Sequence, residues 1–551
     1  MAIIGKINSA EHLCAYYCAD SSITPEIVRE HISKRLAAYM IPSCLIRMDS
    51  MPQTPNGKTD VRRLPEPYLS FVSELSEPEN ETEKLLCDIF AQVLGMDKVS
   101  AQSSFFDLGG TSLTVTSVLV KANEKGLEIS YTDIFSLKTP RALAKKAAGA
   151  QSFDDGLSDY DYSAFDDILK ANVFDDGTAA KNEIGDLLLT GATGFLGIHI
   201  LKRFLEISQA KVWCLVRGRD NSAEGKLKRM LYYYFENDYE ELFGKRIFVI
   251  NASVTSTDWF EQLDGCKIDT VINCAALVKH FSGTDDIERV NTGGVKNLIE
   301  LCKKHGSMLV QVSTGSVAGD RVNGFPLNDR SLDERNFYFG QTIDNDYVKS
   351  KFLAERYVLE AIKDGLRAKI MRVGNLAPRA KDGEFQINFV SNGFMGRLRA
   401  YLVIGAYPYS MMSYPVELAP IDETADAILR LCTTGDKCIV FHPFNNHYIP
   451  LGDIILRMKQ MGLGINLCDD EEFMRCVKAA QSDKQKAAML TTLLAYENKD
   501  SSKKVEMIRT ENEYTTQCLY RLGFNWSMTA DDYISAFLKA LKGLGFFKVE
   551  E

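Results

Sequence analysis

The sequence is poor in histidine and has none of the residue spacings of a metal site. Among 551 residues there are 7 histidines, and only His442 and His447 lie near each other. The 13 cysteines are scattered, and Cys14 and Cys18, the closest pair, have no second pair or nearby histidine to complete a zinc site. We therefore expect no bound metal.

Basic clusters, a secretion signal and long apolar runs are also missing. The start, MAIIGKINSAEHLCAYY, lacks the basic and apolar regions of a signal peptide, and no apolar run is long enough to span a bilayer. The net charge is -10, and Lys and Arg do not gather as a phosphate-tracking surface would require. We expect a cytoplasmic protein with reduced cysteines, and neither nucleic acid nor a membrane as partner.

Changes in composition divide the chain into several regions. Residues 64–80 carry three prolines among polar residues, and residues 151–184 carry eight aspartates with interleaved aromatics. Both read as connectors, although the aromatics indicate that parts of the second pack on a neighbour. The expected division is a unit at 1–65, a linker at 66–80, a small helical unit at 81–150, an acidic linker at 151–184 and a domain at 185–551.

Short apolar strands alternate with helices from residue 185 onward. The strands are DLLLTGA, KVWCLVR, RIFVIN, TVINCAA, MLVQVST and AKIMRVG, and helices are expected at 195–207, 222–236 and 286–304. This alternation predicts a Rossmann-like, doubly wound parallel sheet covered on both faces. Residues 185–380 are expected mainly to bind a nucleotide, and residues 381–551 mainly to form a helical substrate lobe.

A glycine-rich turn follows the first of these strands. LLLTGATGFLG places Gly191, Gly194 and Gly197 between a strand and a helix, where glycine lets the backbone approach a pyrophosphate and the helix supplies free amides. The next strand ends in CLVRGRD. Arg217 and Arg219 match the 2′-phosphate of NADP(H), although Asp220 is typical of NAD and the arginines alone are also compatible with ordinary surface charge.

A tyrosine and a lysine lie four residues apart in DNDYVKSKFLAER, so Tyr347 and Lys351 share one helix face. A neighbouring ammonium is expected to lower the tyrosine pKa, which makes the phenol a better acid or base. Upstream, LVQVSTGSVAG ends a strand with Ser313 and Thr314, whose hydroxyls are expected beside that tyrosine. On its own, the Tyr-Lys spacing would also fit a solvated helix face.

Together these residues resemble a known family. Residues 185 to about 450 resemble extended short-chain dehydrogenases/reductases, and LVRGRD, NCAALVKH and the YVKSK helix resemble their thioester reductase branch. The resemblance implies a triad of Thr314, Tyr347 and Lys351, with Asn291 in the helix behind it. Ser253 departs from the family, where an acid is frequent, and leaves the adenine contacts open. The implied cofactor site comprises Gly191, Thr193, Gly194, Phe195, Leu196, Gly197, Arg217, Arg219, Ala275 and Lys351.

The stretch FFDLGGTSL resembles the attachment motif of peptidyl carrier proteins, which are four-helix bundles. The resemblance implies that Ser112 carries a 4′-phosphopantetheine arm, whose negative charge the helix N-terminus would stabilise. Thr111 departs from the motif, where His or Asp is more frequent. Without the domain that follows, a simple helix cap explains the same residues.

The first region, 1–65, resembles the α+β C-terminal subdomain of adenylation enzymes. MPQTPNGKTDVRRLP contains Lys58, which matches the lysine that reaches the acyl-adenylate in that family, and Asn-Gly also fits a hairpin turn. The large adenylation core is missing from these residues. The resemblance therefore implies a terminal fragment of a nonribosomal peptide synthetase, with upstream modules and a phosphopantetheinyl transferase as partners.

The function that these resemblances imply is reductive release of a carrier-bound peptidyl or aminoacyl thioester. NADPH would give hydride to the thioester carbonyl, and the product would be an aldehyde or, after a second reduction, an alcohol. Two alternatives stay open at this point. One is release by redox-independent cyclisation on the same fold, and the other is a non-catalytic docking segment.

Overall fold

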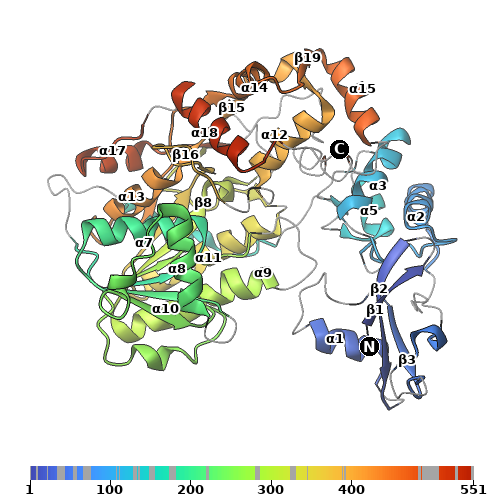
Figure 1. Ribbon diagram of the computed structural model, residues 1–551, viewed down its shortest axis with the longest axis horizontal. Coiled ribbons are helices and arrows are strands. Elements are labelled where there is room, and N and C mark those ends of the chain that lie inside the picture. Colours follow the sequence, from blue (N-terminus) through green and yellow to red (C-terminus); the bar gives the residue numbers. More distant parts are fainter. Residues whose placement is uncertain are drawn as a thin grey trace. The chain divides into compact units, whose positions relative to one another are not determined.

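The computed structural model divides the chain into two compact units, formed mainly by Met1–Phe153 and by Asp154–Leu493 with Ser502–Glu551. Figure 1 shows the helices and strands of both. The structure describes residues 2–7, 10–20, 23–33, 42, 44–53, 59–65, 76–106, 108–110, 112–127, 129, 133–134, 137–147, 156–172, 182–218, 222–278, 286–319, 321–322, 331–343, 345–386, 389, 392–481, 486, 490, 508–527 and 531–547.

The N-terminal part of the first unit is a small α+β arrangement, as expected. Its sheet contains β1 (Ala2–Ile7), β2 (Ala10–Cys18) and β3 (Cys44–Met48), with β1–β2 antiparallel and β2–β3 parallel, and α1 covers Pro25–Ser33. Cys14, Tyr16, Cys44 and Ile46 form its buried core. A 3-10 turn, Val61–Arg63, follows. Lys58 lies outside the described residues.

The second part of the first unit, after residue 75, is helical. Its helices are α2 (Glu81–Leu94), α3 (Ser112–Glu124) and α5 (Pro140–Ala147), three elements of the expected four-helix bundle. Asn80 caps α2 by accepting a hydrogen bond from the Glu83 amide at 2.8 Å. Buried Glu83 lies 3.2 Å from the Arg141 guanidinium, which ties α2 to α5. The structure therefore confirms a small helical unit in this region.

A seven-stranded parallel sheet forms the centre of the second unit, and its order confirms the Rossmann-like prediction. Consecutive strands are added outward from β4 in two directions, which places a switch point between β4 and β7. The strands, in spatial order, are β17 (Val440–Phe441), β12 (Ala368–Val373), β8 (Met308–Thr314), β7 (Thr270–Asn273), β4 (Leu187–Thr190), β5 (Val212–Val216) and β6 (Ile247–Asn251).

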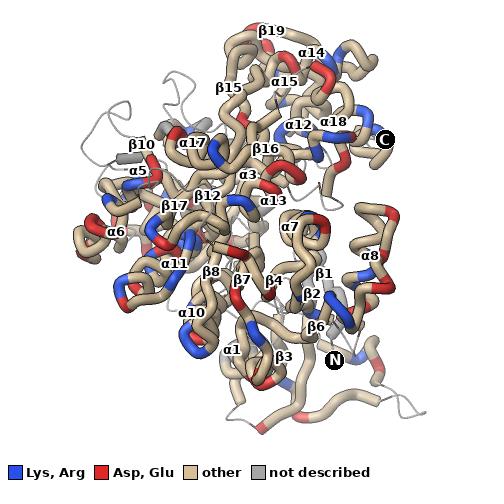
Figure 2. The backbone as a smooth tube through the Cα atoms, turned by 90° about the vertical axis from the view of Figure 1, so that its left-hand side faces the viewer, with Lys and Arg blue, Asp and Glu red and all other residues tan. Residues whose placement is uncertain are grey.

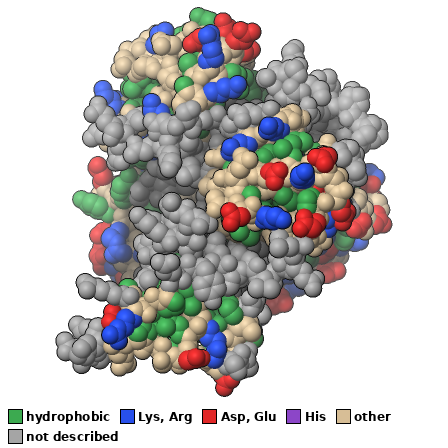
Figure 3. Space-filling model, turned by 90° about the vertical axis from the view of Figure 1, so that its right-hand side faces the viewer, with side chains coloured by type: hydrophobic (Ala, Val, Ile, Leu, Met, Phe, Trp, Pro, Cys, Tyr) green, Lys and Arg blue, Asp and Glu red, His purple; other side chains and the backbone are tan. Residues whose placement is uncertain are grey.

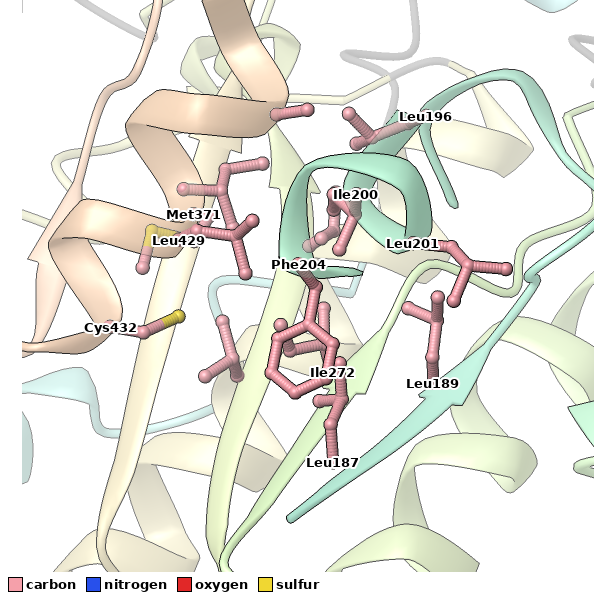
Figure 4. Close-up of a cluster of buried hydrophobic side chains, with 14 of the residues drawn as sticks. Leu187, Leu189, Leu196, Ile200, Leu201, Phe204, Ile272, Met371, Leu429 and Cys432 are labelled. Atoms are coloured by element: carbon pink, nitrogen blue, oxygen red, sulfur yellow. The ribbon is translucent and has the colours of Figure 1, made fainter. Parts of the chain in front are cut away.

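Helices cover both faces of this sheet. Leu187 and Leu189 belong to the core on one face, and Leu188 belongs to the core on the other, as strand alternation requires. The first face is covered by α7 (Phe195–Ile207), α8 (Ala223–Phe235), α13 (Ile421–Cys432) and α17 (Glu513–Arg521). The second is covered by α10 (Gly294–His305) and α11 (Asp346–Lys363). Figure 4 shows side chains of the first core, including Leu187, Leu189, Ile200, Phe204, Ile272, Leu429 and Cys432.

Residues 151–184 are only in part the acidic linker that we expected. Their described stretch 156–172 contains a 3-10 turn, Tyr162–Phe165, and α6 (Asp166–Lys170), and it packs on the second core. The Tyr160 hydroxyl donates to Glu360 at 2.9 Å, and buried Asn172 donates to the Val440 carbonyl at 3.1 Å. The correction has a simple cause, because aromatic burial outweighs the exposed aspartates between them.

The expected division at residue 380 is also too simple. An outer lobe does follow it, but α13 and β17 return to the central sheet, and α17 packs behind them. Figure 1 shows the outer lobe above the sheet. It comprises α12 (Gly393–Ile404), β14 (Ala406–Pro408), β15 (Pro415–Val416), β18 (Ile449–Pro450), α14 (Leu451–Gln460), β19 (Asn466–Cys468), α15 (Asp470–Gln481) and α18 (Asp531–Gly543).

Short paired strands complete the second unit. They are β9 (Arg321–Val322) with β11 (Gln341–Thr342), β10 (Ser331–Leu332) with β20 (Arg509–Thr510), and β13 (Leu376–Ala377) with β16 (Ala419–Pro420). Before α10 the chain forms α9 (Asp286–Glu288) and a π-helical turn, Arg289–Gly293. The helices predicted at 195–207, 222–236 and 286–304 are all confirmed within a residue or two.

Charges of both signs are mixed on the described residues that Figures 2 and 3 display. Figures 2 and 3 show Lys and Arg interspersed with Asp and Glu, rather than gathered in one basic stripe, on the described residues that they display. Within the described ranges, no helix combines the length and apolarity needed to cross a membrane.

Candidate functional site

The glycine turn after β4 is packed so tightly that side chains have no room. Gly191 has φ +68°, and a Cβ there would lie 2.7 Å from the Ala275 nitrogen. A Cβ on Gly197 would lie 2.2 Å from the Gly191 carbonyl oxygen. Gly194 caps α7, and its amide donates to Gly191 at 2.8 Å. The turn therefore brings the free amides of α7 close to the carboxyl end of β4, which is the geometry of a phosphate cradle.

A buried polar network supports this turn, and the sequence patterns did not lead us to expect it. The Thr190 hydroxyl donates to Asn273 Oδ1 at 2.5 Å, and Asn273 Nδ2 donates to Gln311 Oε1 at 2.8 Å. The Ala275 amide donates to both Thr190 and Asn273 at 3.2 Å. A signal was present, because each of the apolar strands LLLT, TVIN and MLVQVST carries a polar residue near its carboxyl end.

Arg217 follows β5 and is exposed to solvent. Strand β5 lies beside β4, the strand that the glycine turn follows. The following amide, of Gly218, donates to Asn251 Oδ1 at 2.9 Å, which anchors the start of the loop to β6. Arg219 and Asp220 lie outside the described residues. Ser253 is the residue that departs from the family pattern. Its hydroxyl forms a hydrogen bond with the Thr255 hydroxyl at 2.9 Å.

Tyr347 and Lys351 lie one turn apart in α11, as predicted. Lys351 is buried, and its Nζ donates to the Val312 carbonyl of β8 at 2.8 Å. Burial lowers the pKa of Lys351 to about 8, partly opposed by the Cys274 thiol and the Glu355 carboxylate. Burial also raises the pKa of Tyr347 to about 12. The expected lowering of the tyrosine pKa is therefore wrong here, because desolvation dominates.

Ser313 and Thr314 end β8 with different surroundings. Buried Ser313 donates its hydroxyl to Glu355 Oε1 at 2.5 Å. Half-buried Thr314 caps the 3-10 turn Gly315–Ala318, and its Oγ1 accepts from the Ser316 amide at 3.2 Å. Of the two hydroxyls, that of Thr314 is the one at the accessible end of the strand.

Asn291 fixes the backbone around the tyrosine. Its Oδ1 accepts from the Leu277 amide at 2.7 Å, and its Nδ2 donates to the Ser350 hydroxyl at 2.9 Å. The Ser350 hydroxyl in turn donates to the Tyr347 carbonyl at 2.7 Å. The π-helical turn that contains Asn291 is thus joined to the first turn of α11. This agrees with the family resemblance, which places Asn291 in the helix behind Tyr347 and Lys351.

Ser112 is the first residue of α3. The glycines before it have separate structural reasons: Gly109 has φ +94°, and a Cβ on Gly110 would lie 2.3 Å from the Phe105 ring. Asp107 and Thr111 lie outside the described residues. The backbone therefore reaches Ser112 through a turn that packs against an aromatic core residue.

Comparisons with known protein families give one match in each of the two units. The phosphopantetheine attachment site family matches residues 84–146, and the male sterility protein family, a nucleotide-binding family, matches residues 189–428. These matches indicate a covalently attached phosphopantetheine on the first unit and a nicotinamide cofactor on the second.

Individual curated relatives are much longer than this chain. A linear gramicidin synthase polypeptide of Brevibacillus parabrevis is 27% identical over 507 residues, which are 86% of this chain and 10% of that protein. Glycine betaine reductase ATRR of Emericella nidulans is 25% identical over 445 residues, 75% of this chain and 34% of that protein. The chain thus spans about a third or less of these curated relatives.

A solved structure matches along nearly the whole chain. It is the thiolation-reductase di-domain from an archaeal non-ribosomal peptide synthetase, at 36% identity and a TM-score of 0.75. The match covers 86% of this chain and 100% of that one. The carrier motif, the glycine turn and the Tyr-Lys helix follow one another in this order along the present chain. The protein therefore belongs to the thiolation–reductase family of non-ribosomal peptide synthetases.

Proposed function

We propose that this chain releases a carrier-bound peptidyl or aminoacyl thioester by reduction with NADPH, giving an aldehyde. Two observations support the proposal. The glycine turn and Thr314 both lie at carboxyl ends of strands in the parallel sheet, and Lys351, one turn from Tyr347 in α11, donates to β8 two residues before Thr314. In open α/β sheets this edge is where ligands bind. A carrier unit precedes this site in the same chain.

The residues present fit an NADP(H) cofactor. The cradle formed by Gly191, Gly194 and Gly197 leaves no room for a Cβ at two of its three glycines, which suits a backbone that approaches phosphate oxygens. Arg217 is exposed beside it and would pair with a 2′-phosphate. The described neighbours that would line the site are Thr193, Phe195, Leu196 and Ala275, and the sequence adds Arg219, which lies outside the described residues.

In the proposed mechanism a nicotinamide held by the glycine turn would supply the hydride that reduces the thioester carbonyl carbon. Tyr347 donates its phenolic proton to the carbonyl oxygen, and burial keeps that phenol protonated until it is needed. Thr314 donates a hydrogen bond to the same oxygen as charge develops there. Lys351, one turn along α11 from Tyr347, would stabilise the phenolate left after transfer. Breaking the carbon–sulfur bond, with the hydroxyl proton passing to the departing sulfur, would then release the aldehyde and the free thiol.

The carrier unit would deliver the acyl group on an arm attached to Ser112. A tethered thioester stays at high effective concentration near the site, so diffusion does not limit its capture. We further propose that upstream synthetase modules, including the adenylation core that residues 1–65 would complete, load this arm. A phosphopantetheinyl transferase would attach it.

The test uses the full chain, modified with phosphopantetheine and loaded with an acyl group, in the presence of NADPH. We expect loss of absorbance at 340 nm and an aldehyde in the mass spectrum, and Ser112→Ala should abolish both. Tyr347→Phe should keep NADPH binding and lose roughly a hundredfold or more of turnover. Tyr357→Phe in the same helix, whose hydroxyl contacts Arg356, serves as the matched control. Product release without NADPH oxidation would instead indicate cyclisation. Absence of both product release and NADPH oxidation would indicate a docking role.

A further inference from the structure

The helix face that carries Tyr347 and Lys351 continues with a third polar residue, Glu355. The three residues follow at intervals of four in α11, so they lie one turn apart along one side of the helix. Glu355 is completely buried. Since an ionised carboxylate is tolerated in the interior only with charged and hydrogen-bonding partners, its contacts indicate what it does.

Two hydrogen bonds join this face of α11 to successive residues of β8. Lys351 Nζ donates to the Val312 carbonyl at 2.8 Å, and the Ser313 hydroxyl donates to Glu355 Oε1 at 2.5 Å. The bonds lie one turn apart on the helix and one residue apart on the strand. Together they fix the height and the rotation of α11 on β8, and thereby the place of Tyr347 relative to the end of that strand.

Arg372 supplies the opposite charge. It lies on β12 directly beside Ser313 in the parallel register. Its Nε is 3.0 Å from Glu355 Oε2, its Nη2 is 2.8 Å from the same oxygen, and both side chains are fully buried. Ser313 and Arg372 therefore reach the same carboxylate from neighbouring strands, so Glu355 joins α11, β8 and β12 in one contact.

The C-terminal part of the chain closes this group. Arg372 Nη1 lies 3.1 Å from His442 Nε2, and His442 Nδ1 lies 2.5 Å from the Glu511 carbonyl oxygen. Burial and the Arg372 charge hold the pKa of His442 well below its usual range, so the imidazole is neutral, accepts from Arg372 and donates to Glu511. Glu355 thus has two partners, Ser313 and Arg372, and His442 in turn contacts Arg372 from the C-terminal part of the chain.

We infer that Glu355 is a positioning residue of the reductase site. Through Ser313 it sets the backbone from which Thr314 extends, and with Lys351 it sets α11 on β8. Successive strand residues face opposite sides of the sheet, so holding Ser313 on the side of α11 also sets the direction in which Thr314 extends at the end of β8. This role rests on the proposed reductase function, in which Thr314 and Tyr347 must reach one carbonyl oxygen.

Two variants of the full chain test the inference. Ser313→Ala removes only the hydroxyl and leaves the ion pair intact, whereas Glu355→Gln keeps the shape and removes the charge. Ser307→Ala is the matched control, because Ser307 is equally buried and donates to the Ile268 carbonyl at 2.6 Å beside the opposite end of β8. With a hexanoyl group on the carrier, we expect Ser313→Ala to lower kcat roughly tenfold to a hundredfold, since a displacement near 1 Å has such an effect. NADPH affinity should not change, and Ser307→Ala should match the parent in both.

Amide hydrogen exchange provides a readout that does not need turnover. Exchange across residues 313–319 should become faster in Ser313→Ala and Glu355→Gln, and should stay unchanged in Ser307→Ala. Unchanged exchange would overturn the inference, and so would faster exchange with an unchanged kcat, because the contact would then be structural only. If the parent chain oxidises no NADPH, the proposed function fails, and exchange alone decides whether Glu355 positions the end of β8.

Discussion

Gly197→Ala is the sharpest test of the nucleotide cradle. The new Cβ would lie 2.2 Å from the Gly191 carbonyl oxygen and 2.8 Å from its carbon, both backbone atoms. A tolerable C···O contact is about 3.3 Å, so the turn and α7 would have to separate by about 1 Å. Overpacking of this kind costs about 1–3 kcal/mol of folding stability. Because the displaced turn is the one that would meet the pyrophosphate, we also expect a roughly tenfold to hundredfold weaker NADPH affinity.

The direction of the effect separates this argument from helix propensity. Alanine is better than glycine in a helix by about 1 kcal/mol, so propensity alone predicts a more stable variant. Gly225→Ala in α8 is the matched control, because its Cβ would meet only the flexible end of Arg229, at 3.3 Å. NADPH titration by fluorescence and thermal unfolding would measure both variants. Wild-type NADPH affinity in Gly197→Ala would refute the reasoning.

Three further predictions concern charge. Arg217→Ala should reduce the preference for NADPH over NADH by roughly tenfold to a hundredfold, because a charged hydrogen bond is lost. Arg229→Ala, at another exposed arginine, should not change this preference. If Arg217→Ala and the parent have the same ratio of kcat/KM for NADPH to kcat/KM for NADH, the prediction is contradicted. Because the pKa of Lys351 is lowered to about 8, its ammonium is present below that pH, and kcat/KM should fall as pH rises through about 8; a rate still rising at higher pH would exclude the ammonium. Burial raises the pKa of Glu417 to about 8, so the stability of its protonated form is present at acid pH and is lost as pH rises through that value. Glu417→Gln should therefore melt at an increasingly higher temperature than the parent between acid pH and pH 8, and parallel melting curves would count against this assignment.

Local patterns predicted much of the site. The glycines follow an apolar strand and open a helix, and Tyr347 and Lys351 are separated by one helical turn, so their arrangement depends on a few consecutive residues. The sheet followed from the alternation of strands and helices, because parallel strands need crossover helices. Predictions of this kind rest on short-range geometry, and the structure shows the corresponding elements with nearly the expected bounds.

Contacts between distant segments could not be predicted in this way. The ion pair of Glu355 and Arg372 joins residues of α11 and β12 and needs the sheet register to be known. The aromatics of 151–184 indicated packing on a neighbour, but the sequence could not show which residues they contact, such as Glu360 for Tyr160. The pKa of Tyr347 was predicted in the wrong direction because a neighbouring lysine is visible in the sequence, whereas the depth of burial is not.

The return of α13 and β17 to the sheet after the outer lobe has begun bears on engineering. The segments of the lobe alternate along the chain with segments of the nucleotide-binding sheet. Replacing everything after one junction would therefore also remove the edge strand β17 and the helices α13 and α17. A chimera intended to exchange this lobe should instead transplant residues 393–416, 449–481 and 531–543 as three separate segments. The joints would then fall in connections on either side of a scaffold left whole.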